Sequence, residues 1–336
     1  MYKTIDLALQ GGGSHGAFTW GVLERFLEAE SLVIEGLCGT SAGAMNSTMV
    51  AYGMHIGGRE GAIKMLEAFW QKTSEAFDKS PIKPSFLDRW LGTGRMDFSP
   101  SYYMFDFLTM MSSPYQNNLF DINPLRDLLL ELIDFDELRK STAMKLFVCA
   151  TNVRTSRPKV FSKKDISVDA VLASACLPSL FKAVEIDGEA YWDGGFMGNP
   201  PIFPLIDDTE TEDIVLVQIN PIHRPDIPKT AVEIRDRINE LSFNSSLMHE
   251  MRRINFVQRM LEADLNQEGK LRNLYIHHVK AEEEMTNLGV SSKLNADWDF
   301  LQKLRKLGRR SADVWLKENY DHLGKKSTCN IDQEFL

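Results

Sequence analysis

Cysteines are few in this chain, and their spacing does not group them. The 336 residues include four, Cys38, Cys149, Cys176 and Cys329, and no two of them have C-x-x-C spacing. The first three lie in apolar segments, where a free thiol behaves as a small core residue. This distribution argues against a disulfide framework and against a zinc site, and we expect no metal.

Long hydrophobic runs are also missing. Lys3 and Asp6 interrupt the apolar N-terminal stretch, so it has no signal-peptide core, and no later run approaches the roughly 20 apolar residues that span a bilayer. The sequence has no internal repeat and no low-complexity linker. We therefore expect a cytoplasmic protein, an expectation compatible with peripheral membrane association or non-classical secretion.

Positive charge is in deficit. Lys and Arg number 38 against 47 Asp and Glu, so the formal net charge is −9. Such a charge opposes nonspecific binding to nucleic acid or anionic lipid, and we expect no nucleic-acid partner. Membrane contact would have to be local. The basic amphipathic run WDFLQKLRKLGRR (298–310) is one candidate, although a solvated helix face with a buried apolar side is the favoured interpretation.

Strand-like and helix-like segments alternate at the start of the chain. TIDLALQ (4–10) precedes a helical pattern over about 16–29, and LVIEGLCG (32–39) precedes another over about 42–52. Two such units predict an α/β fold with a parallel sheet. DIVLVQINP (213–221) is typical of a further, fully buried strand.

The middle of the chain is less regular. Residues 70–125 mix glycine and proline with aromatics and methionines, and they predict a lid-like insertion. Within it, YYMFDFLTMM (102–111) could line an acyl pocket, enter lipid or pack as core. Further predicted elements are a helix at 123–133, a strand at 145–152, a hairpin arm at 157–162, a helix at 167–177, a hairpin about Asp187-Gly188, a strand at 273–280 and an amphipathic helix at 296–320.

The glycines of QGGGSHGAF (10–18) admit two interpretations. Gly11, Gly13 and Gly16 match the G-x-G-x-x-G spacing that binds a dinucleotide pyrophosphate. The same geometry, a strand followed by a glycine loop and a helix, can direct backbone N–H groups at a developing oxyanion. The first interpretation needs an acidic residue at the end of the second strand, and Glu35 comes too early for that role.

A second motif, GTSAG (39–43), occupies that strand end. It satisfies G-x-S-x-G, in which a serine sits on a sharp turn from strand to helix, and we expect this turn to expose Ser41. A Ser–His–Asp triad would require Asp193 together with His223 or His277. However, the serine follows only the second strand, which does not fit the α/β-hydrolase topology, and the histidines are more simply surface or sheet residues.

Four blocks together resemble the patatin-like phospholipase family. They are QGGGSHGAF, GTSAG, ASACLP (173–178) and DGGFMGNPP (193–201), in this order and spacing. The resemblance covers about residues 5–205, and the C-terminal third resembles the helical extension of some bacterial members. It implies a three-layer α/β/α fold with a mainly parallel sheet, and a serine acyl hydrolase that cleaves carboxylic esters of lipids without metal or organic cofactor.

The resemblance also implies roles for individual residues. Ser41 would be the nucleophile and Asp193 its base, so that no histidine is required. The oxyanion hole would consist of the N–H groups of Gly11, Gly12 and Gly13. The two motifs would be supported by Gly39, Gly43, Gly194 and Gly195.

One residue departs from the family pattern. Many members have arginine or lysine in the glycine loop where this chain has His15, so a fixed cation for a lipid phosphate is missing or depends on pH. A purely local role for His15, in packing or capping, is at least as good an interpretation. Cleavage of phosphate-bearing substrates is therefore less well supported than ester cleavage itself.

These patterns lead to one domain prediction and leave two alternatives open. We expect a catalytic domain over residues 1–221 with the insertion inside it, and a mostly helical extension over 222–336 packed on it. The expected partner is a lipid or another acyl ester. The alternatives are an esterase for short acyl or polyester substrates and a dinucleotide-binding regulatory or redox protein, which would bind NAD.

Overall fold

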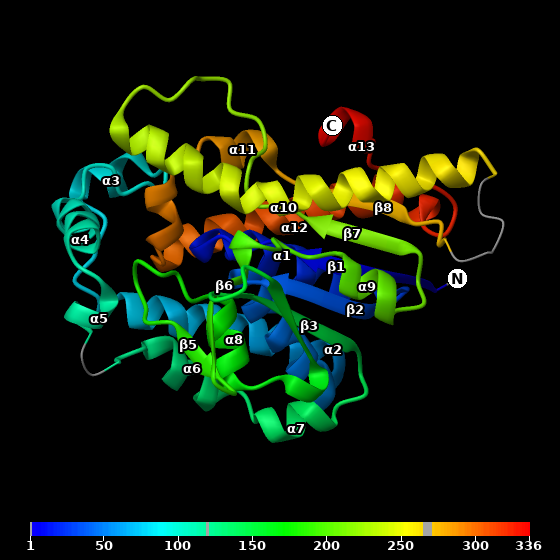
Figure 1. Ribbon diagram of the computed structural model, residues 1–336, viewed down its shortest axis with the longest axis horizontal. Helices are drawn as coiled ribbons and strands as arrows, with labels where there is room; N and C mark the ends of the chain where they lie inside the picture. The colour runs from blue at the N-terminus through cyan, green and yellow to red at the C-terminus, as the bar shows by residue number, and fades with distance from the viewer. Residues whose placement is uncertain (1, 119–120, 265–270) are drawn as a thin grey trace.

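A central eight-stranded sheet with helices on both faces organises the molecule (Figure 1). The computed structural model describes residues 2–118, 121–264 and 271–336. Strand order across the sheet is β5-β6-β3-β2-β1-β7-β8, and β4 also pairs with β3. The predicted α/β class, with a mainly parallel sheet between helical layers, is confirmed.

Five of the eight strands pair in parallel and form the centre and one edge of the sheet. β3, β2, β1, β7 and β8 pair in parallel, whereas β4 and β6 run antiparallel to β3, and β5 antiparallel to β6. The strands are β1 (Lys3–Leu9), β2 (Leu32–Thr40), β3 (Lys145–Asn152), β4 (Pro158–Ser162), β5 (Val184–Ile186), β6 (Glu189–Asp193), β7 (Asp213–Val217) and β8 (Tyr275–Val279).

Helices follow most of these strands along the chain. The α-helices are α1 (Gly16–Glu28), α2 (Ala42–Phe77), α3 (Phe86–Leu91), α4 (Pro100–Met111), α5 (Pro114–Asn117), α6 (Pro124–Leu132), α7 (Phe135–Lys140), α8 (Val168–Ser174), α9 (Phe203–Asp208), α10 (Ala231–Glu262), α11 (Glu282–Thr286), α12 (Trp298–Asn319) and α13 (Ile331–Glu334). The 3₁₀ helices are η1 (Gly13–His15), η2 (Lys163–Asp165), η3 (Gly194–Phe196), η4 (Val290–Leu294) and η5 (Tyr320–His322).

Two differences from the predicted elements have local causes. α2 extends far beyond the predicted end at residue 52, because only Gly57 and Gly58 leave helical geometry and the helix resumes after them. In α4, only Tyr102 is buried, and neighbouring side chains such as Phe107 and Met111 are exposed. The interpretation of residues 102–111 as core is therefore wrong. α3, α4 and α5 lie together at the left end of the view in Figure 1.

The C-terminal part of the chain is built into this fold. β8 extends the sheet beside β7, and α12 packs closely on α1. A Cβ at Gly21 would lie 2.0 Å from the carbonyl oxygen of Arg305, so the two helix backbones touch. Arg305 Nε also donates a 2.8 Å hydrogen bond to Glu24. Part of the basic run 298–310 thus pairs with α1, and its apolar residues Phe300, Leu301 and Leu304 are buried, which agrees with the expected buried apolar side.

The sequence predicts neither a disulfide framework nor a membrane-spanning helix. All four cysteines are free and buried. Within the described ranges, no helix combines the length and the apolar character needed to cross a bilayer.

Candidate active site

The sheet brings three of the sequence blocks together. The glycine loop begins where β1 ends, Ser41 follows β2 directly, and Asp193 is the last residue of β6. Asp193 pairs with Ala150 of β3, and the adjacent residue, Cys149, pairs with Thr40 of β2. Asp193 therefore reaches the level at which β2 turns into α2.

The turn after β2 has the geometry of a nucleophile elbow. Ser41 has φ 53° and ψ −120°, a combination that L-residues rarely adopt. Its N–H donates a 2.9 Å hydrogen bond to Ser174 Oγ, which comes from the ASACLP block. A Cβ at Gly39 would lie 2.4 Å from the carbonyl carbon of Gly43, and a Cβ at Gly43 would lie 2.2 Å from the Leu9 oxygen. Both glycines are thus required by close backbone packing.

Ser41 is less accessible than its motif suggests. Only 9% of the residue is exposed, so the expectation of an exposed serine is wrong. The cause is the glycine loop, which lies against the turn: a Cβ at Gly11 would be 2.6 Å from Ser41 Cβ. The loop therefore forms one wall of the space around the serine.

Asp193 is fully buried and rigidly held. Its N–H donates to the Cys176 oxygen at 2.8 Å, and its carbonyl accepts from Thr151 Oγ1 at 2.8 Å. Within the carboxylate, Oδ1 accepts from Gly195 N at 2.7 Å. Oδ2 has no hydrogen-bond partner among the described residues, which leaves it able to accept a proton.

The environment of Asp193 moves its titration close to neutrality. Burial raises the pKa of its carboxyl group to about 7, while the Gly195 N–H, the Ser41 hydroxyl and the charge of Lys293 each lower it in part. The Ser41 hydroxyl is thus near enough to influence the carboxylate, although the two do not form a hydrogen bond of standard geometry. A carboxylate with this pKa is suited to general-base chemistry near neutral pH.

The glycine loop presents two unengaged backbone donors. The N–H groups of Gly12 and Gly13 donate to none of the residues described. The Gly11 N–H instead donates a 2.6 Å hydrogen bond to Asn199 Oδ1, so it is not free to bind an oxyanion as the family pattern suggests. Gly13 has φ +60°, and a Cβ there would lie 2.4 Å from the Lys293 oxygen.

Gly194 and Gly195 permit close packing beside the carboxylate. A Cβ at Gly194 would lie 2.2 Å from the Cys149 oxygen, and a Cβ at Gly195 would lie 2.2 Å from the Phe243 ring. Larger residues here would displace the turn that holds Asp193.

The histidines of the triad alternative lie elsewhere. His277 Nε2 is 2.9 Å from Asp213 Oδ1, at the opposite end of β7 from the site, and its Nδ1 is 2.9 Å from Thr328 Oγ1. His278 Nδ1 is 2.8 Å from Glu334, and His223 is exposed. None of the three has a described contact with Ser41 or Asp193.

Glu35 has a structural role rather than the one a dinucleotide site needs. It lies within β2 and accepts hydrogen bonds from the N–H groups of Glu210 and Thr211 at 2.8 and 2.9 Å. It also pairs with Lys145 at 2.9 Å. Glu35 therefore ties neighbouring strands together instead of facing the glycine loop.

His15 does not provide a cation at the loop. It is 2% exposed, and its Nε2 lies 2.7 Å from Ser292 Oγ of η4. Burial, and then the charges of Lys293 and Arg224, hold the pKa of His15 well below its usual value, so the ring is neutral at neutral pH. This is the local packing role, not the pH-dependent cation.

Several residues of the site carry no obvious signal in the sequence. Asn199 and Ser174 lie within the quoted blocks, but only the fold shows that their side chains bind Gly11 and Ser41. Asn220 is the next-to-last residue of the predicted strand at 213–221, and Lys293 lies in the C-terminal region, with no local pattern to mark it. They could not be found from spacing because their partners are distant in the chain.

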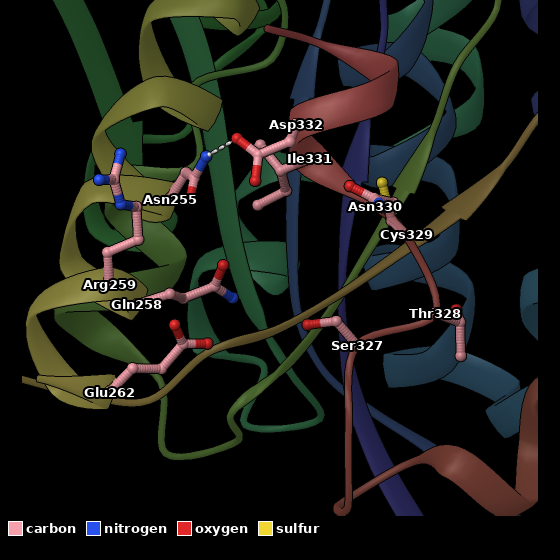
Figure 2. A pocket seen from close by; sticks show the side chains of 10 residues that line it. All are labelled: Asn255, Gln258, Arg259, Glu262, Ser327, Thr328, Cys329, Asn330, Ile331 and Asp332. Atoms are coloured by element: carbon pink, nitrogen blue, oxygen red, sulfur yellow. Dashed lines mark hydrogen bonds between the residues drawn. The ribbon is translucent and has the colours of Figure 1, made fainter.

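A cavity of about 370 Å³ lies away from this site, between α10 and the segment before α13. Figure 2 shows its lining, which includes Asn255, Arg259 and Cys329. Close to it, His278, Cys329 and Glu334 form a cluster of potential metal ligands, but Glu334 also lies 2.7 Å from Lys280 Nζ. An ammonium group at that carboxylate competes with a metal ion for it.

Comparison with known proteins identifies the family. The model of the patatin-like phospholipases matches residues 7–206, more than half of the chain. The chain belongs to the patatin-like phospholipase family. Among solved structures, this patatin-like protein is similar to VipD from Legionella pneumophila, with 15% identity and a TM-score of 0.37 over 90% of this chain and 67% of VipD. No curated protein sequence gives a significant match. Membership assigns the chain to the lipolytic acyl hydrolases.

Proposed function

We propose that this patatin-like protein hydrolyses carboxylic esters of lipids through a Ser41–Asp193 dyad and an acyl-enzyme. The observation that carries the proposal is the buried Oδ2 of Asp193, which has no partner among the described residues and lies near the hydroxyl of a serine on a strained turn. No histidine, metal or organic cofactor is part of the proposal.

The first half of the reaction acylates the serine. Asp193 accepts the Ser41 hydroxyl proton on Oδ2 while Oγ attacks the ester carbonyl carbon. The carbonyl oxygen becomes an oxyanion, which accepts hydrogen bonds from the N–H groups of Gly12 and Gly13. When the tetrahedral intermediate collapses, the bond to the alcohol breaks and Asp193 returns the proton to the departing alkoxide.

The second half regenerates the enzyme. Asp193 removes a proton from water, which attacks the acyl carbonyl, and the same backbone donors stabilise the second oxyanion. Collapse releases the carboxylic acid, and the proton on Asp193 passes back to Ser41 Oγ. Each proton taken by the carboxylate is thus returned within the same half-reaction, so one carboxylate serves as both base and acid.

A Ser41→Ala variant tests the nucleophile. We expect it to lose ester hydrolysis and labelling by a fluorophosphonate probe, because both reactions form a covalent bond to Oγ. Ser242→Ala, which removes a half-buried serine of α10 whose hydroxyl donates to the Ile238 oxygen, is the matched control and should keep both. Hydrolysis by purified Ser41→Ala would contradict the proposal if its specific activity stays constant through repeated purification, which excludes a contaminating esterase.

One observation favours a narrower substrate class. Because His15 is buried and neutral, the glycine loop itself presents no cation for a phosphate next to the scissile ester. The second candidate is therefore an esterase for short acyl or polyester substrates that lack a phosphate head group. Comparing kcat/KM for a phospholipid with that for a neutral ester of the same acyl chain separates the two, because the second candidate predicts that the neutral ester is preferred.

A further inference from the structure

A lysine of the C-terminal region lies directly behind the glycine loop. Lys293 Nζ donates a 2.8 Å hydrogen bond to Asn220 Oδ1. Asn220 Nδ2 in turn donates a 2.7 Å hydrogen bond to the carbonyl oxygen of Gly11. One side-chain amide therefore connects the C-terminal region to the loop that lies against Ser41.

The orientation of the Asn220 amide is set by the groups that its oxygen and its nitrogen contact. An ammonium group has donors only, so the amide oxygen must face Lys293. The amide nitrogen faces two acceptors, the Gly11 oxygen and Gln10 Oε1, which lies at 3.3 Å. A reversed amide would put donor against donor at one end and acceptor against acceptors at the other. Lys293 thus favours the same orientation of Asn220 that the Gly11 oxygen and Gln10 Oε1 require.

Asn220 in turn sets the direction of the Gly12 N–H. In a planar trans peptide, the carbonyl and the following N–H point in opposite directions. With the Gly11 oxygen held on Asn220, the Gly12 N–H points away from Asn220, and it meets no described partner. On the preceding peptide, the Gly11 N–H is held by Asn199 Oδ1 at 2.6 Å. Both peptides of Gly11 are therefore fixed.

The charged groups around Lys293 come from several elements. Burial lowers the pKa of Lys293, Glu240 raises it, Arg224 lowers it, and Asp236 and Asp193 raise it. Glu240 is itself engaged by Arg224 at 2.5 Å and by Arg237 at 3.1 Å. No carboxylate of the described residues pairs directly with Lys293 Nζ, so Asn220 is the partner through which the lysine acts.

We propose that Lys293 is a positioning residue: through Asn220 it holds the Gly11–Gly12 peptide so that the Gly12 N–H faces the reaction centre. The C-terminal region would then complete the oxyanion site. This inference rests on the proposed function, because it assigns Gly12 the role of an oxyanion donor.

Two substitutions interrupt the connection at different points. Lys293→Met keeps the unbranched side chain up to the ε position and removes the donor. Asn220→Asp keeps an acceptor for Lys293 but replaces the donor to Gly11 with an oxygen. On a soluble ester we expect kcat to fall about tenfold for Lys293→Met and about a hundredfold for Asn220→Asp, the size of effect seen when an oxyanion donor is displaced, with KM changed less than about twofold.

Three further readouts distinguish positioning from a general structural role. The double variant should be no slower than Asn220→Asp alone, because both changes act on one peptide. Lys293→Gln, which keeps a neutral donor, should retain more turnover than Lys293→Met. The acid limb of the kcat/KM profile should move to higher pH in Lys293→Met, because the positive charge that lowers the pKa of Asp193 is lost.

Lys280→Met is the matched control, and Ser41→Ala separates the two hypotheses. Lys280 is a half-buried lysine of the same region that pairs with Glu334 and Glu282, and its loss should leave kcat unchanged. Parent kcat in Lys293→Met, or a raised KM with parent kcat, overturns the positioning role. Turnover that persists in Ser41→Ala overturns the proposed function instead, so the two failures are distinct. If Lys293→Met does not fold, the comparison of Lys293→Gln with Asn220→Asp decides.

Discussion

The glycine loop and the α3–α5 insertion place their characteristic residues in opposite environments. In the loop, Gly11 and Gly12 are buried, and the backbone N–H and carbonyl of Gly11 are engaged by Asn199 and Asn220. In the insertion, large apolar side chains are exposed, with Met111 of α4 at 69% and Phe86 at 81%. Buried polar groups must be satisfied, which makes the loop rigid, whereas exposed apolar groups gain little from folding. We therefore expect substitutions in the loop to change turnover or stability, and substitutions of exposed residues in the insertion to leave stability unchanged.

Asp193→Asn should give the largest loss. The amide keeps the shape of the side chain but cannot accept the Ser41 proton, so kcat should fall by about 10²–10⁴-fold. In the parent protein, kcat/KM should rise with pH to a plateau above about pH 7, because the base must be deprotonated and its pKa is about 7. Steady-state kinetics from pH 5 to pH 9 measure both. Activity that does not depend on ionisation in this range would contradict the role of Asp193.

The same substitution should increase stability at alkaline pH. The pKa of Asp193 is raised on folding, so the stability that the protonated carboxyl contributes is present below its unfolded pKa, near 4, and is lost as the pH rises through about 7. Asp193→Asn removes this loss because its side chain does not ionise. We expect its Tm to exceed that of the parent at pH 8 and to approach the parent value at pH 4.5. An equal difference in Tm between variant and parent at pH 8 and pH 4.5 would show that burial of the charge is not the cause.

Gly12→Ala should lower turnover about a hundredfold with little change in KM, as expected for a displaced oxyanion donor. Its φ of 168° is accessible to alanine, and the new Cβ would lie 2.9 Å from the flexible end of Ile219 and 3.4 Å from Asn220 Oδ1. NAD should not raise the Tm of the parent protein, whereas a dinucleotide site would give a saturable shift that Gly12→Ala removes. Such a shift, with parent turnover in the variant, would assign the loop to phosphate binding.

Gly13→Ala complements Gly12→Ala, because its main effect should be on stability and not on turnover. Gly13 has φ +60°, and a Cβ there would lie 2.4 Å from a backbone oxygen of η4. Thermal unfolding should therefore show a clear loss of stability for Gly13→Ala and a smaller one for Gly12→Ala. Equal losses for the two variants would contradict the packing of η4 on the loop.

Substitutions in the insertion, unlike Gly13→Ala in the loop, should leave stability almost unchanged. Phe107→Ser with Met111→Ser should leave Tm within a few degrees of the parent, because both side chains are exposed. If α4 contacts lipid or lines the entry of an acyl chain, turnover of an ester presented in vesicles should fall severalfold, while turnover of a soluble short-chain ester stays unchanged. Equal effects on the two substrates would exclude a role in lipid contact. Thr109→Ser, a conservative change on the same helix, is the control.

The smallest effect on turnover should follow His277→Ala. Its partners, Asp213 and Thr328, lie away from Ser41, so kcat should stay within about twofold of the parent. Stability should fall by about 1–3 kcal/mol, because the substitution leaves a buried acceptor with fewer partners. A loss of kcat comparable to that of Asp193→Asn, without unfolding, would support a triad.

Local patterns predicted the elements and the motif positions well. The strand at 145–152 and the start of the helix at residue 16 agree with β3 and α1, because alternation and periodicity report which face of a segment is buried. The end of α2 was not predictable in this way, since glycines at 57 and 58 suggest a stop and only the packing of Leu66 and Trp70 shows that the helix continues. The accessibility of Ser41 was predicted wrongly because it depends on the loop that covers it.

Local motifs in the chain are sufficient to identify the family, the α/β class and the residue types of the candidate site, because each block carries its own signature. Tertiary structure decided which backbone donors are free. It engages the Gly11 N–H on Asn199, buries His15 as a neutral ring, and brings Lys293 to the loop through Asn220. These contacts join segments far apart in the chain. Their energies come from burial and hydrogen-bond satisfaction, which depend on neighbours in space rather than in sequence.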